Sequence, residues 1–506
     1  MLQAGAQAAL DRVVAAGAVV ALLGLFGCAG SDPTPIRQGS GYGLVPPFIG
    51  RAAAPRPLVG GSVPRHPFMA ASGSNNMHGD SYASDTHAAS GPLGHDPVVV
   101  STARGLLGGE CASVTFDRQG RIVTVCASAL RMQLLLLDPH TLRELARYDL
   151  PRRPSTRTLS FRRITSDTSG GVYFYLDHRD RAVLGTAARR IEVVAHDGAA
   201  FHLERAYDLA PMVPEGDAVT AVLPDWTGRY WFVTRQGLVG TVDPESGRIG
   251  SRELAGEEIE NSFAAGPDGV FVVSDHAMYG FVADPVSGAP AIMWREPYDR
   301  GTRRKVGQID QGSGTTPTLL GDEWVAIADN AEPRLNVLVY RRGRDVAGKR
   351  LVCRQPLFAP GASATENSVV GFGHALIVEN NAGYDVFPTM MFGRTGAGGV
   401  ARVDLDDGDG CHVVWESGAI SQTVVPKLSL GNGLLYLYTK RPHAPWWTDA
   451  YYLTAVDFRT GETVYEVLTG TGLGYDNHWA PITLGPDGTA YVGTLRGLLA
   501  VRDGDR

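Results

Sequence analysis

From about residue 97 onward, short apolar and β-prone runs alternate with turn residues, and long amphipathic helical windows are nearly absent. The recurring unit is an apolar run, a Gly or Asp-Gly turn and a second β-prone run, as in residues 114–125, 264–273 and 482–493. The turn recurs at intervals of 41 to 60 residues, at Gly120, Gly171, Gly228, Gly269, Asp322, Gly373, Gly433 and Gly488. A period of about 50 residues built from strands alone predicts the blades of a β-propeller.

Most units carry a second turn that begins with Asp, at Asp138, Asp243, Asp284, Asp404 and Asp457. An Asp carboxylate accepts local backbone hydrogen bonds, so each of these turns suits an outer hairpin and brings the unit to four strands. The last unit lacks its outer strand, whereas residues 97–103 form a strand-like run before the first unit. We therefore expect an all-β fold, a single eight-bladed propeller over residues 97–506, with seven blades as the alternative. An N-terminal strand would close the last blade and remove two open edges.

The segments before the propeller predict an exported protein. Residues 1–27 contain an unbroken apolar run, too short for a membrane span, and are expected to be a signal peptide. The run ends in Leu-Phe-Gly-Cys, which resembles the lipobox of bacterial lipoproteins and implies lipidation of Cys28; an ordinary signal peptide is the alternative. Residues 28–66 are rich in Pro, Gly and Ser, so we expect a flexible tether. Residues 67–96 form a polar segment that we expect on a propeller face.

The net charge and the cysteines of the chain limit the partners and the compartment that we expect for it. A net charge of -7 argues against nucleic acid, which requires a basic surface. The expected location is the bacterial cell envelope, periplasmic or extracellular, with membrane contact through the lipid anchor alone. Four cysteines remain besides Cys28, and they can pair in three ways. Pairing Cys111 with Cys126 and Cys353 with Cys411 would join strands within one unit and across two units, which suits an oxidising compartment.

Six units place a carboxylate shortly before the predicted innermost strand, where the strands open on one mouth of the channel. These acids are Glu110, Asp217, Glu260, Asp310, Glu366 and Asp476, and Asn261, Asn367 and Asn477 follow three of them. Oxygen ligands from several blades suit Ca²⁺ or a small polar ligand. The alternative is that these residues only cap solvated loops.

The polar segment also holds candidate catalytic residues. His78 and Asp80 lie close together in it, and His478 follows Asn477. A His beside a carboxylate can act as a general base or a metal ligand. A surface loop of ordinary polar composition is the alternative.

The Asp-x-x-Thr-Gly turn at residues 457–461 and the late Trp294 and Trp415 resemble the quinoprotein-like propeller superfamily, whose repeats resemble those of pyrroloquinoline quinone (PQQ) enzymes. The resemblance implies a shared architecture over residues 97–506 and fits binding proteins and enzymes alike. Adjacent cysteines, which PQQ dehydrogenases often place beneath the quinone, do not occur, which argues against PQQ. A Cys-x-x-Cys-His motif for haem is also absent.

Three functions follow as hypotheses. The first is a site for a small polar ligand at the mouth, with or without a divalent cation, and with hydrolase activity similar to calcium-dependent propeller lactonases. That likeness implies Glu366, Asn367, Asp476 and Asn477 as metal ligands. The position before the innermost strands makes Glu110, Asp217, Glu260, Asn261 and Asp310 the expected ligand-binding residues. The second is a non-catalytic scaffold that binds an envelope protein. The third is a quinone-dependent oxidoreductase.

Overall fold

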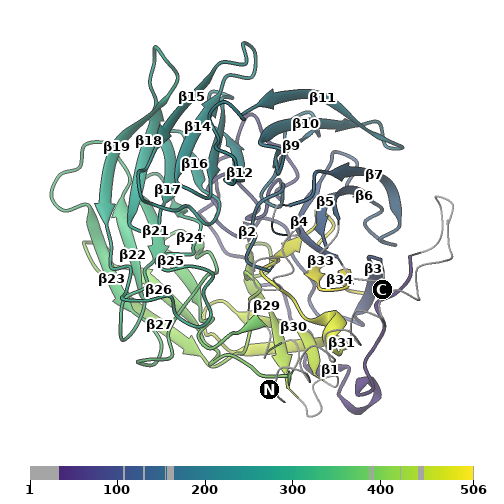
Figure 1. The fold of residues 1–506 in the computed structure, drawn as a ribbon. Coiled ribbons are helices and arrows are strands. Elements are labelled where there is room, and N and C mark those ends of the chain that lie inside the picture. The colour runs from purple at the N-terminus through teal and green to yellow at the C-terminus, as the bar shows by residue number, and fades with distance from the viewer. Residues whose placement is uncertain are drawn as a thin grey trace, which may run out of the picture. The chain divides into compact units, whose positions relative to one another are not determined.

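The computed structural model describes residues 33–105, 109–128, 131–153, 155, 165–386, 389, 392–421, 423–442 and 449–504. Eight sheets of mostly antiparallel strands follow one another around a ring (Figure 1). The fold is thus the eight-bladed propeller that the repeat predicts, and the seven-bladed alternative is wrong. Within the described residues, no helical segment has the length and apolar character needed to cross a bilayer.

In each blade the strands run in chain order from the channel outward. The first four blades comprise β4 (Glu110–Phe116), β5 (Ile122–Ala127), β6 (Met132–Leu137) and β7 (Glu144–Leu150); β8 (Tyr175–Leu176), β9 (Ala182–Thr186), β10 (Arg190–His196) and β11 (Phe201–Asp208); β12 (Val219–Pro224), β13 (Tyr230–Thr234), β14 (Leu238–Val242) and β15 (Ile249–Glu253); and β16 (Ala264–Gly266), β17 (Gly269–Val273), β18 (Ala277–Ala283) and β19 (Pro290–Pro297).

The remaining blades continue the same order, with strands from the N-terminal region added to blades 7 and 8. They comprise β20 (Thr318–Leu320), β21 (Trp324–Ala328), β22 (Asn336–Arg341) and β23 (Leu351–Pro356); β24 (Val370–Phe372), β25 (Ala375–Glu379), β26 (Val400–Leu405) and β27 (Cys411–Ser417); β28 (Lys427–Ser429), β29 (Leu434–Arg441), β30 (Ala450–Asp457) and β31 (Thr463–Thr471) with β1 (Phe48–Gly50) and β2 (Thr86–His87); and β32 (Ile482–Leu484), β33 (Ala490–Thr494) and β34 (Gly497–Arg502) with β3 (Val98–Ala103). Short 3-10 turns occur at Tyr42–Leu44 and Leu473–Tyr475.

The hydrophobic core lies between successive blades rather than inside any one of them. One cluster combines Val193 of blade 2, Trp231 of blade 3 and Phe281 of blade 4, all buried. Because residues alternate between the two faces of a strand, apolar side chains on both faces pack against the neighbouring sheets. The ring is therefore stabilised by burial at every interface between blades.

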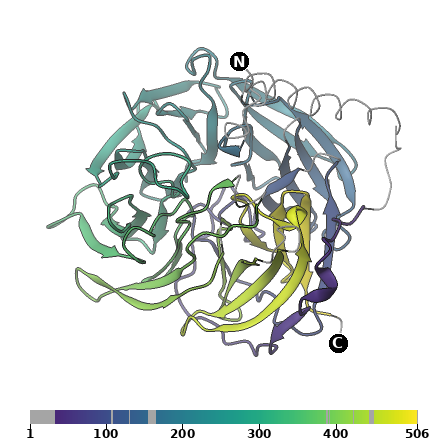
Figure 2. The same cartoon turned by 60° about the horizontal axis from the view of Figure 1, so that its bottom comes forward.

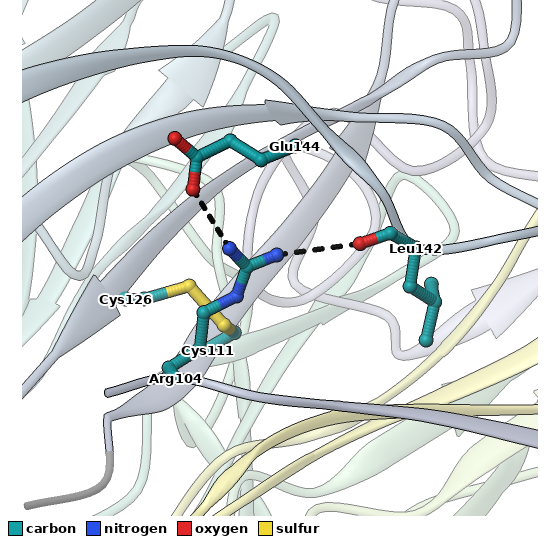
Figure 3. Close-up of a disulfide and its surroundings, with 5 residues drawn as sticks. All are labelled: Arg104, Cys111, Cys126, Leu142 and Glu144. Atoms are coloured by element: carbon teal, nitrogen blue, oxygen red, sulfur yellow. Dashed lines mark hydrogen bonds and ion pairs between the residues drawn. A yellow bond between two sulfur atoms is a disulfide. The ribbon is translucent and has the colours of Figure 1, made fainter. Parts of the chain in front are cut away.

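The ring closes as the sequence predicts. Strand β3 pairs antiparallel with β34, from Val98 opposite Arg502 to Ala103 opposite Gly497. Just beyond β3, Arg104 donates to Glu144 Oε2 at 2.9 Å and to the carbonyl of Leu142 at 3.4 Å, which ties the closing strand to blade 1 (Figure 3). Blade 8 therefore lacks an open outer edge at β34.

Two disulfides confirm one of the three possible pairings. Cys111–Cys126 joins β4 to β5 within blade 1 (Figure 3). Cys353–Cys411 joins the outer strands β23 and β27 of blades 5 and 6. Both bonds agree with an oxidising compartment.

One turn of the repeat was predicted at the wrong residue. Gly171 lies before β8 and packs against Leu184, and the inner turn of blade 2 is formed by residues 177–181. There the Asp177 carboxylate accepts the backbone N–H groups of Arg179 and Arg181 at 2.8 and 2.9 Å. This turn has no Gly because Asp180, with a φ of 60°, occupies the left-handed position that Gly120, with a φ of 75°, occupies in blade 1.

The expectation of a flexible tether is wrong for residues 33–66. Strand β1 pairs with β31 at the outer edge of blade 7, and Ile36 is buried. The N–H groups of Arg56 and Leu58 donate to the carbonyls of Asn432 and Leu430, each at 2.9 Å. The segment has too few apolar residues to order itself by burial. Its backbone hydrogen bonds to the edge of blade 7 order it instead. Residues 1–32, including Cys28, lie outside the described residues.

Candidate functional site

The polar segment enters the ring: its strand β2 lies near the centre (Figure 1), and Figure 2 shows the same ring turned by 60°. The carbonyls of this segment accept backbone N–H groups from the innermost strands of five blades. The donors are Leu176, Ala265, Leu319, Gly371 and Leu428, at 2.7 to 3.0 Å. The segment therefore fills the channel beside these strands, and the acids that precede the strands lie at its mouth. We call residues 74–87 the plug.

Three buried polar side chains, His78, Asp85 and Lys427, hold the plug to blade 7. His78 Nδ1 lies 2.9 Å from Asp85 Oδ2, and Lys427 Nζ donates to Asp85 Oδ1 at 2.6 Å. All three side chains are almost fully buried. His78 Nε2 has no hydrogen-bond partner among the described residues. This leaves one ring nitrogen of His78 able to accept a proton.

The structure gives His78 a different carboxylate partner from the one nearest in sequence. Asp80 accepts the N–H groups of Tyr82 and Ser84 at 2.9 and 3.2 Å and the Ser84 hydroxyl at 2.5 Å. Burial raises the pKa of Asp80 to about 6. Asp80 therefore shapes the turn, whereas Asp85 orients the imidazole.

Glu260 and Glu366, which we call the glutamate pair, come together from blades 4 and 6. Their side chains are within hydrogen-bonding contact of each other, and both are buried. Glu366 Oε1 accepts the N–H of Ile309 at 2.8 Å, but Glu260 Oε1 and Glu366 Oε2 have no donor among the described residues. Burial, and for Glu366 also the neighbouring Glu260, raises the pKa of both carboxyl groups.

The segment that leads into β20 makes this contact possible. A Cβ on Gly314 would lie 1.5 Å from Glu366 Oε2, so only glycine allows the carboxylate to lie there. Tyr173 donates to Asn261 Oδ1 at 2.9 Å, and Asn261 also donates to the Gly314 carbonyl. Asn261 thus positions the loop instead of offering a free oxygen.

Two further residues extend the polar wall of the mouth. Asn367 donates its amide to Glu379 Oε2, while Asn367 Oδ1 and Glu379 Oε1 have no donor among the described residues. Burial raises the pKa of Glu379 well above its usual range. Asp310 forms an ion pair with Arg235, a partly exposed side chain whose charge also acts on Glu260 and Glu366. Arg235 lines an adjoining cleft of about 620 Å³ together with Thr168, Gly216 and Glu258.

The second group of acids lies at blades 7, 8 and 1; we call Glu110, Lys440, Asp449 and Asp476 the Asp476 cluster. Lys440 Nζ lies 2.7 Å from Asp449 Oδ2, and both are buried. Burial raises the pKa of Asp476 to about 6, against the lowering effect of Lys440. Burial and the nearby Asp476 raise the pKa of Glu110. This cluster therefore contains its own cation.

The residues after Asp476 use their hydrogen-bonding groups within the protein. Asn477 donates to the carbonyls of Ala480 and Gly493 at 2.9 and 2.7 Å and accepts from Thr423. His478 Nε2 donates to the Thr165 carbonyl at 2.7 Å, and its Nδ1 accepts from the Tyr384 hydroxyl at 3.0 Å. Burial lowers the pKa of His478 to about 4. Neither side chain has the free group that a metal ligand or general base needs.

Asp217 also has a structural role. Its Oδ1 accepts the N–H groups of Ala218 and Gln236 at 2.8 and 3.0 Å, which ties the start of β12 to the next hairpin. Of the predicted acids, the structure brings together Glu260 with Glu366, and Glu110 with Asp476. Within the described residues, no three His, Cys, Asp or Glu side chains are arranged to hold a metal ion by themselves.

Sequence reasoning missed Lys427, Arg235 and Gly314. A signal existed for Lys427: it is one of four lysines in the chain and stands within the apolar run 424–430, where a charge must be paired. The sequence held no comparable signal for Arg235 or Gly314, because their roles depend on contacts between blades.

Comparisons with known proteins agree with the fold and leave the function open. No protein-family model matches the chain. It is 28% identical over 329 residues to an uncharacterized protein of Archaeoglobus fulgidus, a match that covers 58% of this chain and only 63% of that relative's length. A europium-containing methanol dehydrogenase is similar in structure, with a TM-score of 0.52 and 12% identity over 85% of this chain and 98% of that one. BamB from Moraxella catarrhalis gives a TM-score of 0.44 at 12% identity, over 82% of this chain and 96% of BamB.

The likeness to the methanol dehydrogenase agrees with the class that the sheets define, an eight-bladed β-propeller, as the repeat predicted. At 12% identity the likeness shows the fold alone, so no ligand or reaction follows from it.

Proposed function

We propose that this propeller binds a small polar ligand at its mouth together with a divalent cation, for which Ca²⁺ is the first candidate. One observation carries the proposal: two buried carboxylates, Glu260 and Glu366, touch each other and each keeps an oxygen without a donor. Two carboxylates in such contact repel unless a proton or a cation lies between them. Oxygen atoms at a buried site are the ligands that Ca²⁺ prefers.

The oxygen atoms of the protein at this site suit a cation that takes the rest of its coordination shell from the bound ligand and water. Glu260 and Glu366 supply the charged oxygens, and Asn367 Oδ1 is a further buried oxygen without a donor among the described residues. Ca²⁺ takes six to eight oxygens, so water and ligand hydroxyls would supply the others. The sequence predicts four metal ligands, Glu366, Asn367, Asp476 and Asn477. Only the two from blade 6, Glu366 and Asn367, belong to the proposed site, because the amide of Asn477 is used within the protein.

As the reaction at this site we propose hydrolysis, similar to that of propeller lactonases. His78 would be the base, because Asp85 binds its Nδ1 and its Nε2 is free of partners among the described residues. A carboxylate that holds one ring nitrogen fixes the tautomer that leaves the other able to accept a proton.

Thermal unfolding with and without calcium tests the proposal. For the wild-type chain we expect Ca²⁺ to raise the unfolding midpoint by about 2–5 °C in a saturable way, relative to a chelator. Glu366→Gln should lose this response without lowering the midpoint in chelator, because it removes a repulsion. Glu245→Gln changes an exposed carboxylate outside the mouth and is the matched control. Equal calcium responses in wild type and Glu366→Gln would refute the cation site.

The other hypotheses correspond to defined outcomes. A wild-type chain without any response to divalent cations would favour a non-catalytic scaffold for an envelope protein. A characteristic absorbance after addition of quinone would favour an oxidoreductase.

We also propose export and lipid anchoring at Cys28. The two disulfides support export, because they require an oxidising compartment. Mass spectrometry of the membrane-bound form would detect the lipid.

A further inference from the structure

A cleft of about 450 Å³ opens between loops of blades 5 and 6, separate from the glutamate pair. Three consecutive cationic residues line it, Arg303, Arg304 and Lys305, and Glu332 is the one acid among its lining residues. The opposite wall consists of small residues at 361–364, 382–383 and Ala397. The chain as a whole carries a net charge of -7, so this cleft is a local exception.

Lys305 is the central feature of the cleft. Its Nζ donates to the carbonyls of Ala331 at 2.6 Å and Ser363 at 3.1 Å. Among the described residues no carboxylate lies within 4.0 Å of this ammonium group, although nearby acids such as Asp329 act on it from farther away. An ammonium group has three N–H donors, and these two carbonyls use two of them.

The Lys305 ammonium group is partly buried, so the lack of a close carboxylate affects its energy more than it would at the surface. Burial lowers the pKa of Lys305, which means that its charged form is poorly solvated. A cation that is held by neutral carbonyls and lines an open cleft would gain from an anion placed beside it.

Contacts within the protein hold the loop that carries Lys305 in one conformation. The N–H of Lys305 donates to Gln308 Oε1 at 3.0 Å, and Val306 accepts the N–H of Gly383 at 2.9 Å. Gly307 has a φ of +109°, and a Cβ there would lie 2.1 Å from the Asn381 carbonyl. A site that is formed in advance binds without an ordering cost.

The other two cations extend the positive surface. The Arg303 side chain is 76% exposed, and its Nε lies 3.3 Å from Glu332 Oε1. Arg304 Nη1 donates to the Gln308 carbonyl at 2.9 Å, and its charge acts on Glu260. Arg303 thus stands at the rim, while Arg304 lies between the cleft and the glutamate pair.

We infer that this cleft binds an oxyanion, the phosphate or carboxylate group of a small ligand, with Lys305 as the central donor and Arg303 at the rim. The small residues opposite leave room for such a group, and both cations can donate charge-assisted hydrogen bonds to it. The segment 304–309 separates this site from the glutamate pair, so the inference does not depend on the proposed cation.

Calorimetric titration of the full chain with inorganic phosphate and, separately, with acetate tests the inference. Sodium chloride keeps the ionic strength constant, and the tighter of the two anions identifies the group. We expect saturable binding to the wild-type chain, weakened by about tenfold or more in Lys305→Gln and about threefold or more in Arg303→Gln.

Two controls separate this site from other effects. Lys349→Gln removes an exposed lysine far along the chain and should bind the anion like wild type. Circular dichroism in chloride checks that Lys305→Gln is folded, and if it is not, the exposed Arg303→Gln decides. Absence of anion binding by the wild type, or unchanged affinity in the Lys305 and Arg303 variants, would overturn the inference.

Discussion

Glu260 and Glu366 lie just before innermost strands, as Asp476 does, yet the surroundings of the glutamate pair and of the Asp476 cluster differ. Lys440 forms a 2.7 Å ion pair within the Asp476 cluster. Glu260 and Glu366 instead face each other, and Arg235, whose charge acts on both, forms its ion pair with Asp310. The first arrangement compensates its charges internally, whereas the second leaves negative charge and unused oxygens at a buried position.

This difference teaches how to separate structural acids from functional ones in a repeat. A buried charge that is paired and hydrogen-bonded contributes to the fold, and removing its partner is costly. A buried charge that the fold leaves unsatisfied lowers stability and is a candidate for ligand binding. Removing a partner within the Asp476 cluster should therefore lower the free energy of unfolding, whereas replacing one carboxylate of the glutamate pair by an amide should not.

The largest effect is expected from Lys440→Met in the Asp476 cluster. This change removes the cation from beside Asp449 and Asp476, so the free energy of unfolding should fall by about 3 kcal/mol or more. Urea denaturation measures the change. Lys349→Met, at an exposed lysine, should alter it by less than about 0.5 kcal/mol. A loss below about 1 kcal/mol in Lys440→Met would show that the ion pair is not what stabilises this side of the mouth.

The sequence was sufficient for the architecture because the relevant signals are local. Strand alternation, Asp turns and the unpaired run at residues 97–103 each depend on neighbouring residues, and all three predict the ring that the structure shows. The inner turn of blade 2 was misplaced because Gly171 offered a stronger turn signal than the Asp turn at residues 177–181. The N-terminal segment was misjudged because its order comes from the edge of blade 7, more than 400 residues later.

The candidate site was only partly predictable, since its geometry depends on contacts across the ring. The repeat placed the acids at one mouth but could not show that Glu260 meets Glu366, which depends on the close approach of Gly314. Likewise, Asp80 is nearer to His78 in sequence, but a left-handed φ of 53° at Asp85 turns the chain so that Asp85 binds the imidazole.

Gly314→Ala tests the geometry of the glutamate pair with an intermediate effect. The added methyl group would overlap Glu366 Oε2, so the carboxylate must move away from Glu260. We expect a loss of about 1–3 kcal/mol in unfolding free energy and loss of the calcium response. Gly343→Ala is the control, because the nearest atom to its Cβ would be 3.8 Å away. If Gly314→Ala retains the full calcium response, the two carboxylates do not act together.

The smallest effect concerns pH and the Asp476 side of the mouth, where we interpret His478 as a structural residue. Its folded-state pKa of about 4 lies below the usual value of 6.5, so the unfolded chain binds more protons between these values. Stability is therefore complete above about pH 6.5 and falls as the pH is lowered toward 4. His66 and His87 also have pKa values lowered to about 4 by burial and contribute to the same fall, so the informative quantity is the difference between variant and wild type.

His478→Gln should reduce the loss of stability between pH 7 and pH 5 by about 1–2 kcal/mol, since the variant has no group to protonate there. Urea denaturation at the two pH values measures this difference. His412→Gln, at a largely exposed histidine, should leave it unchanged. An unchanged pH dependence in His478→Gln would mean that the imidazole gains its proton over the same pH range in the folded and the unfolded chain. The hydrogen bond from Nε2 to Thr165 could then persist, but Nδ1 could no longer accept from Tyr384, and the assignment of His478 to the structural side of the mouth would fail.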